Sequence, residues 1–251
     1  MNEQRTFRGP ADLDRDSRQA FVDLIRAVAD SKVVLGRRYA EWANSAPVLE
    51  SGVAAAAMAQ AELGHTRALY MLLREFDEVP AEITDDEQFR DSYNAPAFLD
   101  EPLPAWTDFV TVNLIFDGAM AELIKAMRGS AYEPLAQRTD KMLEEERFHQ
   151  MHGRDWFRRL AKQSDAAREA LQEAVNRVWP ETLCWFGRDE DEGARALARD
   201  GILGATPMEL RDALLNRIGP ILEQAGISQP DAASLAWDRY DPKTRRVEPA
   251  A

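Results

Sequence analysis

The sequence predicts an all-α protein built as a four-helix bundle with a C-terminal helical extension. Three observations predict this fold. Four long segments place apolar residues at helical spacing, and runs of β-branched residues are rare. A long connection, residues 77–103, separates the second segment from the third. Two Glu-x-x-His pairs fall in the second and fourth segments, where each presents a carboxylate and an imidazole on one helical face.

The first two helices are predicted to be antiparallel neighbours. One is expected over about residues 14–43 and the other over about residues 49–76. The segment 44–47, which ends in a proline, breaks the helical pattern between them. Because this turn is short, the two helices must pack against each other in opposite directions.

The crossover, residues 77–103, shows no sustained helical period and contains several prolines. A connection of this length can carry the chain along the bundle, so the second and third helices are predicted to run parallel. The third helix is expected over residues 104–128, with Pro104 in its first turn. The fourth helix is expected over about residues 133–162.

A helical extension is predicted to follow the bundle. A fifth helix is expected over residues 165–178 and is expected to stop before Pro180. The segment 206–209 has the form of a capping box with proline at the first helical position, and it predicts a helix that reaches about Ile218. A short last helix is expected over residues 220–225.

The chain is therefore interpreted as a single helical domain with loose ends. The domain spans residues 13–241, with its four-helix core at about 14–162 and its extension at about 165–226. The polar residues 1–12 and the residues 242–251 are expected to be loose tails.

The composition limits which kinds of partner the protein has and in which cellular compartment it is expected. A net charge of −13 argues against nucleic acid and anionic membranes as main partners. The single cysteine, Cys184, rules out an internal disulfide and suits a reducing cytoplasm. The N-terminus lacks the apolar core of a signal peptide, and no apolar run approaches the length of a membrane span. We expect a soluble, cytoplasmic protein.

The two Glu-x-x-His pairs are Glu62/His65 and Glu146/His149, and they contain two of the three histidines. One such pair occurs easily by chance, whereas two pairs in the second and fourth helices are much more specific. Ferritin-like bundles bind a di-iron or di-manganese centre with this pattern, adding one carboxylate from each of the other two helices. The fold is therefore interpreted as ferritin-like.

The carboxylate expected from the first helix is missing. Glu62 lies 16 residues beyond the turn at Ala46, so its antiparallel neighbour should lie near residue 30. Asp30 has the right chemistry, but half of its helical neighbours are charged, and it is expected to face largely outward. Lys32 has apolar neighbours and is expected to point inward, so that a base replaces the acid.

The third helix offers Asp117, whose helical face is apolar apart from Asn113. A carboxylate in such a place must find a metal, a cation or hydrogen bonds, because an unpaired buried charge is costly. Glu122 is the alternative ligand, but its neighbour Lys125 suggests a pair in contact with solvent.

Simpler interpretations remain open for these residues. The glutamates of the two pairs could lie on the surface, their histidines could be core residues satisfied by carboxylates, and Asp117 could be buried and hydrogen-bonded without a metal. His152 is interpreted as structural or exposed. The acidic segment 187–193 is interpreted as a solvated loop, since it lacks the spacing of a calcium-binding loop.

Several short motifs resemble one known family. They are residues 35–42 (LGRRYAEW), 46–50, 89–91 (FRD), 116–117 (FD) and 178–180 (VWP). Together they resemble the phenylacetate-CoA oxygenase PaaA/PaaC family, and most closely its PaaC branch. The resemblance covers roughly residues 15–190, and the first motif is the most specific of the five.

The resemblance implies a function and a ligand set. The catalytic branch of the family holds a di-iron centre that activates O2 and epoxidises the aromatic ring of a CoA thioester, whereas the PaaC branch is a structural partner with a degraded site. Five of the six ligand positions of the catalytic pattern match Glu62, His65, Asp117, Glu146 and His149. Lys32 stands at the sixth position, where a glutamate is expected.

Three hypotheses follow. The chain is a subunit of a phenylacetyl-CoA epoxidase-type complex that carries iron, or manganese, in a full or partial site. Alternatively it is a metal-free structural subunit that braces a homologous catalytic α subunit. The third hypothesis, a ferritin- or rubrerythrin-like iron or peroxide protein, is disfavoured by the absence of rubredoxin-type cysteines. The first two hypotheses place the chain in the same kind of complex, whose substrate is an acyl-CoA. The sequence leaves open whether copies of the chain also associate with each other.

Overall fold

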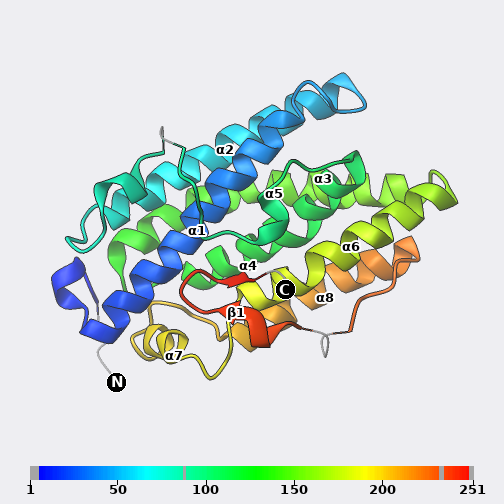
Figure 1. The fold of residues 1–251 in the computed structure, drawn as a ribbon. Coiled ribbons are helices and arrows are strands. Elements are labelled where there is room, and N and C mark those ends of the chain that lie inside the picture. The colour runs from blue at the N-terminus through cyan, green and yellow to red at the C-terminus, as the bar shows by residue number, and fades with distance from the viewer. Residues whose placement is uncertain (1–5, 87–88, 232–234, 249–251) are drawn as a thin grey trace.

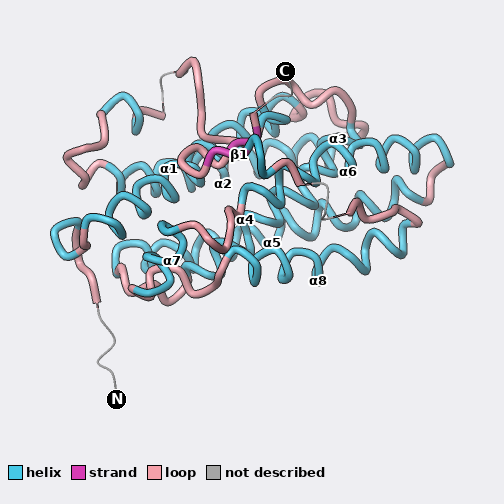
Figure 2. The backbone as a smooth tube through the Cα atoms, turned by 60° about the horizontal axis from the view of Figure 1, so that its bottom comes forward, coloured by secondary structure: helices cyan, strands magenta, loops and turns pink. Residues whose placement is uncertain are grey.

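The computed structural model describes residues 6–86, 89–231 and 235–248 and confirms the all-α bundle (Figure 1). Within these residues the only strands are β1 (Tyr240–Asp241) and β2 (Arg246–Val247), which form one short hairpin. The rest is helix or loop, as the tube in Figure 2 shows. None of the described helices is both long enough and apolar enough to cross a membrane.

Helices α1 (Arg15–Glu41) and α2 (Leu49–Leu73) form the antiparallel pair that the short turn predicts. The side chain of Asp14 caps α1 by accepting a hydrogen bond from the backbone N–H of Ser17 at 2.8 Å. At the turn the two helices approach so closely that a Cβ atom on Gly52 would collide with the carbonyl oxygen of Ala43. Glycine is therefore required where the second helix begins.

The third helix of the bundle is not regular. It consists of α3 (Trp106–Val112), a π-helical turn η4 (Asn113–Asp117) and α4 (Gly118–Met127). The turn packs against α5 (Glu133–Ala161), the fourth helix of the bundle. Single π-helical turns are frequent at functional sites because they re-aim side chains. Here the turn ends at Asp117, the residue that the sequence singled out.

The extension differs from the prediction in two helices. Helix α6 (Asp165–Trp185) continues through Pro180, and α8 (Pro207–Ala225) continues through Pro220. Proline removes one backbone hydrogen bond, but buried residues such as Trp179 and Leu183 flank Pro180, and their burial offsets that loss. The expected stop at residue 178 and the separate last helix are therefore wrong.

Other parts of the extension follow the sequence more closely. The capping box at α8 is present, since Thr206 and Glu209 each accept a hydrogen bond from the other's backbone N–H. The acidic segment 187–193 is a loop only as far as Asp191, because α7 (Glu192–Arg199) begins directly after it. The sequence did not predict α7.

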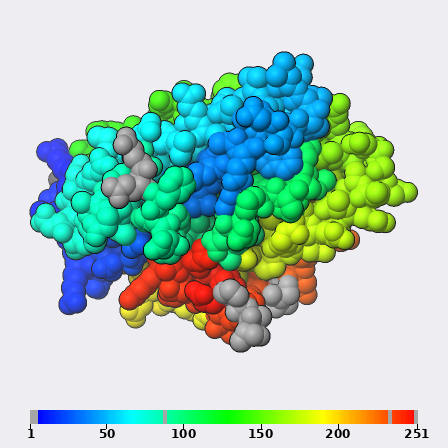
Figure 3. All heavy atoms as spheres, turned by 45° about the horizontal axis from the view of Figure 1, so that its top comes forward, coloured from blue at the N-terminus to red at the C-terminus, as the bar shows by residue number. Residues whose placement is uncertain are grey.

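The described parts of both tails belong to the folded structure, which corrects the expectation of loose ends. Phe7 is buried, and its backbone N–H donates to the carbonyl oxygen of Ala131 at 2.8 Å. At the other end the guanidinium of Arg246 donates to the carbonyl oxygen of Ala95 at 2.6 Å. Figure 3 shows this C-terminal segment, in red, lying against the crossover, in green. Residues 1–5 and 249–251 lie outside the described residues.

The close turn between α1 and α2 generates a stability prediction. Gly52→Ala should lower the free energy of unfolding by about 1–3 kcal/mol, because the added methyl group forces a backbone shift. Gly64→Ala is the matched control on the same helix, since nothing lies within 4 Å of its Cβ position. That change should stabilise the protein by about 0.5–1 kcal/mol. Urea denaturation of both variants checks the pair, and equal effects would contradict the close-approach account.

Candidate metal centre

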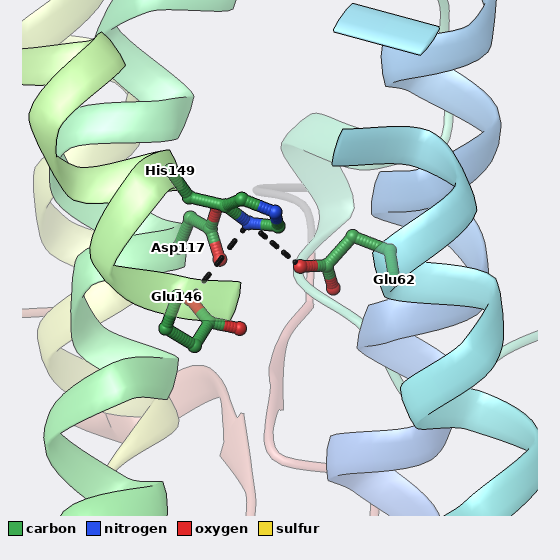
Figure 4. A group of neighbouring side chains, drawn as sticks. All are labelled: Glu62, Asp117, Glu146 and His149. Atoms are coloured by element: carbon green, nitrogen blue, oxygen red, sulfur yellow. Dashed lines mark hydrogen bonds and ion pairs between the residues drawn. The ribbon is translucent and has the colours of Figure 1, made fainter. Parts of the chain in front are cut away.

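Four acidic and histidine side chains converge in the middle of the bundle. They are Glu62, Asp117, Glu146 and His149, which offer oxygen and nitrogen atoms that all lie within 4.8 Å of one another. Figure 4 shows Glu62, from α2, facing the other three, from η4 and α5. The spacing of three residues puts Glu146 and His149 on one face of α5. All four are buried.

Lys32 lies in the centre of the three carboxylates. Its Nζ atom is 2.9 Å from Glu62 Oε2 and 3.6 Å from Asp117 Oδ1, and it also donates to Glu146 Oε1. The side chain is fully buried. The structure therefore places Lys32 inward and at the depth of Glu62, as the count from the turn predicts.

Asp30 is buried, and the expectation that it faces outward is wrong. Its carboxylate accepts hydrogen bonds from the hydroxyl of Tyr70 at 2.6 Å and the backbone N–H of Asn94 at 2.8 Å, and it also pairs with Arg90. The charged neighbours of Asp30 indicated solvent, but the crossover folds back over this face of α1 and brings Arg90 to it. Asp30 thus holds the crossover against α1. Among the described contacts, none joins Asp30 to the cluster around Lys32.

His149 links two of the carboxylates. Its Nδ1 atom is 3.0 Å from Asp117 Oδ2 and 3.1 Å from Glu62 Oε1. Burial alone would lower the pKa of His149, but the neighbouring Asp117 and its hydrogen bonds outweigh burial and raise that pKa well above its ordinary value. The imidazole is therefore held as a cation.

Asp117 is the most heavily bonded carboxylate of the cluster. Its Oδ2 atom also accepts from the hydroxyl of Tyr39 at 3.0 Å and the amide of Asn113 at 3.2 Å. Burial would raise the pKa of Asp117, but His149 and Lys32 outweigh it and hold that pKa below its usual range. Burial and the Asp117 carboxylate raise the pKa of Tyr39, so its phenol keeps its proton.

His65 lies beside the cluster and not within it. Its Nε2 atom is 2.7 Å from Glu145 Oε2, and its buried Nδ1 atom lies 3.6 Å from Glu146 Oε1 without a hydrogen bond. Burial, reinforced by Lys32, lowers the pKa of His65 to about 2, so the ring is neutral. The four-residue group contains four of the five predicted ligands, and His65 is the one it leaves out.

The protonation of the cluster balances its charge. Burial would lower the pKa of Lys32, but Glu146, Glu62 and Asp117 outweigh burial and raise it. Burial and the nearby Asp117 carboxylate raise the pKa of Glu146 well above its ordinary value. Lys32 and His149 thus bring two positive charges to the three carboxyl groups, and the raised pKa of Glu146 favours retention of a proton that offsets the remaining negative charge. This balance is what allows so many ionisable groups to be buried together.

Sequence reasoning missed the residues that bond to the ligands. Tyr39 and Asn113 hold Asp117, and Glu145 holds His65. Tyr39 lies in an apolar stripe, which predicts simple packing, although a buried phenol hydroxyl usually finds a partner. Polar atoms on inward faces are the signal that could have found Tyr39 and Asn113, whereas Glu145 is partly exposed and carries no such signal.

Glu122 and His152 lie in surroundings that the sequence alone did not determine. Glu122 is mostly buried and contacts Lys125 at 2.8 Å and Arg217 of α8 at 3.2 Å, so the expected solvated pair is wrong. The extension supplies the cation that the bundle sequence did not show. His152 is partly buried and its Nδ1 atom lies 3.1 Å from Asn113 Oδ1, which agrees with a structural role.

The donor set fits a divalent metal ion in its chemistry. Asp117 Oδ1, Glu146 Oε2 and His65 Nδ1 are buried without a hydrogen-bond partner, which leaves ligand capacity unused. Carboxylate oxygen and imidazole nitrogen are donors that non-haem iron and manganese accept. A cavity of about 890 Å³ between α2 and α5 is lined by His65 and His149 and connects this region with the surface.

Comparisons with known sequences all point to the same protein family. The family described as "Phenylacetic acid catabolic protein" (PaaA_PaaC) matches residues 1–243. Two relatives are the A and C subunits of 1,2-phenylacetyl-CoA epoxidase from Escherichia coli (strain K12). The first is 28% identical over 237 residues, which are 91% of this chain and 74% of the relative. The second is 28% identical over 207 residues, 81% of each chain, so identity does not separate the two branches.

Solved structures agree on the fold. A mutant of an R2-like ligand-binding oxidase with a Mn/Fe cofactor superposes with a TM-score of 0.65 at 16% identity, covering 92% of this chain and 88% of the other. A second structure of that oxidase gives 0.63 at 15% identity, covering 99% and 88%. The match confirms the ferritin-like fold, and with the sequence matches it shows that the chain belongs to the phenylacetic acid catabolic (PaaA/PaaC) protein family.

Proposed function

We propose that this chain is a subunit of a multicomponent oxygenase of the phenylacetyl-CoA epoxidase type, in which a lysine ammonium takes the place of one metal ion. Both curated relatives are subunits of such an epoxidase by name. The observation that carries the proposal is the position of Lys32 Nζ, in contact with Glu62 and Glu146 at the centre of the carboxylates. The chain therefore holds at most one metal ion.

Electrostatics support this limit. Lys32 stays protonated because three carboxylates surround it. Each divalent ion about 4 Å from the ammonium would be repelled by about 8 kcal/mol at an effective dielectric constant near 20. The carboxyl groups would have to offset this repulsion once for a single ion and twice for a pair. Carboxylates that already face Lys32 cannot offer both their oxygens to two further ions.

A single ion, iron or manganese, would be held by Asp117, Glu146 and His149, with Glu62 within reach. Such an ion would supply the redox chemistry that O2 activation requires. The protein's own part is orientation, because Tyr39 and Asn113 fix Asp117 while Glu145 fixes the ring of His65. His149 would have to give up its extra proton first, so metal binding releases protons.

The surface supports a partner subunit. Large apolar side chains are exposed along α2 and α5, and they include Leu49 at 81%, Val53 at 63% and Phe148 at 67%. Exposed large apolar side chains on these two helices are candidates for contact with another protein. A homologous catalytic α subunit is the partner we propose for this face, and self-association of the chain is the competing outcome. An acyl-CoA would then be a substrate of the complex.

A second candidate, a catalytic subunit with two metal ions, is favoured by one observation. His65 Nδ1 is buried, unbonded and close to Glu146, as a ligand to a second ion would be. If Lys32 swung away, this nitrogen and Glu62 could take part in such a site. The ferritin- or rubrerythrin-like alternative receives no support from the family match.

Metal content distinguishes the two candidates. Purified wild-type protein loaded with Fe²⁺ or Mn²⁺ should contain at most one ion per chain by elemental analysis. Lys32→Glu restores the expected carboxylate and should raise the content toward two. Lys162→Glu makes the same charge change at an exposed position and should leave the content unchanged. Two ions in the wild type would contradict the proposal.

Removing the ammonium should destabilise the metal-free chain. Lys32→Met leaves the carboxylates without their cation and should lower the free energy of unfolding by about 3–5 kcal/mol in chelator. Mn²⁺ at about 100 times its dissociation constant should restore about 2.7 kcal/mol by mass action. Denaturant titrations with and without the ion measure both effects. A Lys32→Met variant as stable as the wild type would show that the lysine does not replace a metal charge.

A further inference from the structure

We propose that a chain of aromatic side chains conducts single oxidising equivalents from the centre to the protein surface, where a small reductant quenches them. The chain runs from Tyr39 through Phe109 and Trp106 to Trp156 and Trp42. Its biological use rests on the proposed oxygenase function, since it would discharge the centre when no substrate is bound. The conduction itself requires no metal and can be tested without one.

The inner end of the chain is bonded to the cluster. The hydroxyl of Tyr39 donates to Asp117 Oδ2 at 3.0 Å, and the ring is fully buried. The ring centroid of Tyr39 lies 5.0 Å from that of Phe109. Tyr39 is therefore the oxidisable aromatic side chain that is hydrogen-bonded to a candidate ligand, and an oxidant formed at the cluster would take its electron from this ring.

The middle of the chain is continuous ring contact. Phe109 and Trp106 stack with centroids 4.4 Å apart and planes inclined by 12°. Trp106 then meets Trp156 at 5.3 Å and Trp42 at 5.4 Å. Phe109 is not itself oxidised under these conditions, so it serves as the contact across which an electron passes from Trp106 to Tyr39. Trp42 also meets Phe109 directly at 6.0 Å, so two routes lead outward from Phe109, one through Trp106 and one through Trp42.

The indole of Trp106 is suited to carry a positive hole. Its N–H group is buried and has no hydrogen-bond acceptor. A Trp106 radical cation therefore lacks a neighbouring group to take its proton, and it remains a strong oxidant that passes the hole on. An indole with a bonded base would lose its proton and trap the hole instead.

The outer end of the chain opens on a surface cavity. Trp106 and Trp156 line a cavity of about 540 Å³ together with Arg159 and Lys162. The guanidinium carbon of Arg159 lies 4.7 Å from the ring centroid of Trp156. These two cations favour an anionic reductant, such as ascorbate or a thiolate, at the end of the path.

The steps balance in electrons and protons. Tyr39 gives one electron to a one-electron oxidant at the cluster, which bound iron or manganese would supply after reaction with O2, while its phenol proton moves to Asp117 Oδ2. Trp106 then reduces the tyrosyl radical, and the proton returns to the phenol oxygen. Trp156 reduces Trp106, and the anionic reductant reduces Trp156. The net change is one electron from the reductant to the oxidant, with no lasting change in the protein.

A second set of aromatic contacts lies near the cluster, but among the described residues it offers no oxidisable ring at the surface. Phe116, next to Asp117 in the turn, meets Trp185 at 5.3 Å, and Trp185 meets Phe186 at 6.0 Å. Trp185 and Phe186 are both buried. Phe116 also meets the partly buried Phe98 at 5.4 Å, but a phenylalanine ring does not hold a hole. The tryptophans that contact Phe109 are therefore the ones to test.

The conduit can be tested in metal-free protein by driving a hole inward. Protein in chelator is mixed with ruthenium tris-bipyridine and an electron acceptor, flashed, frozen and examined by electron paramagnetic resonance. The signal of interest is the tyrosyl radical present in the wild type and missing in Tyr39→Phe. The double variant Trp42→Phe/Trp106→Phe removes both tryptophans that contact Phe109 and should lose this signal. Trp237→Phe, a tryptophan outside the chain, should keep it.

Each outcome decides the proposal. A Tyr39-dependent signal that persists undiminished in the Trp42→Phe/Trp106→Phe variant would overturn it, as would the absence of that signal from the wild type. Far-UV circular dichroism checks that the variants fold. Both substitutions lie at partly exposed positions, and if the double variant unfolds, the single variants Trp42→Phe and Trp106→Phe should each weaken the tyrosyl signal. A protein that passes this test but binds no metal would disprove the proposed function while leaving the conduit intact.

Discussion

The structure depends on the burial of Lys32 among three carboxylates. Removing an ammonium or a carboxylate from water costs several kcal/mol, and the cost is repaid only when the charges pair closely. Here α1, α2, η4 and α5 each supply one partner, so the four helices must meet at one depth. A metal ion plays this part in the ferritin-like template, and an ammonium can play part of it because it neutralises the same oxygens.

The surroundings of the cluster follow from the same constraint. Asp117 must reach the centre from a helix that also packs against α5, and the π-helical turn provides the necessary shift. Tyr39 and Asn113 then donate hydrogen bonds to Asp117 Oδ2, the oxygen that His149 also contacts. The extension adds Arg217, which pairs with the buried Glu122. Ionisable groups inside this bundle are thus paired by elements far apart in the sequence.

The sequence could predict what depends on helical spacing and on one short turn. The Glu-x-x-His pairs and the depth of Lys32 are of this kind, and four of the five candidate ligands meet as expected. It could not predict contacts made by the crossover and the extension, which is why Asp30 was expected outside. Pro180 was expected to end a helix because local propensity favours a break, whereas tertiary burial decided the outcome.

The most direct test of the central claim is a crystal structure of the wild-type protein grown in excess Mn²⁺, with anomalous scattering measured at the manganese edge. The account predicts no anomalous peak at the position of Lys32 Nζ, at most one peak in the cluster, and clear density for the ammonium between Glu62 and Glu146. Two fully occupied peaks about 3.5–4 Å apart, the separation typical of two-metal sites, with Lys32 turned away, would contradict it.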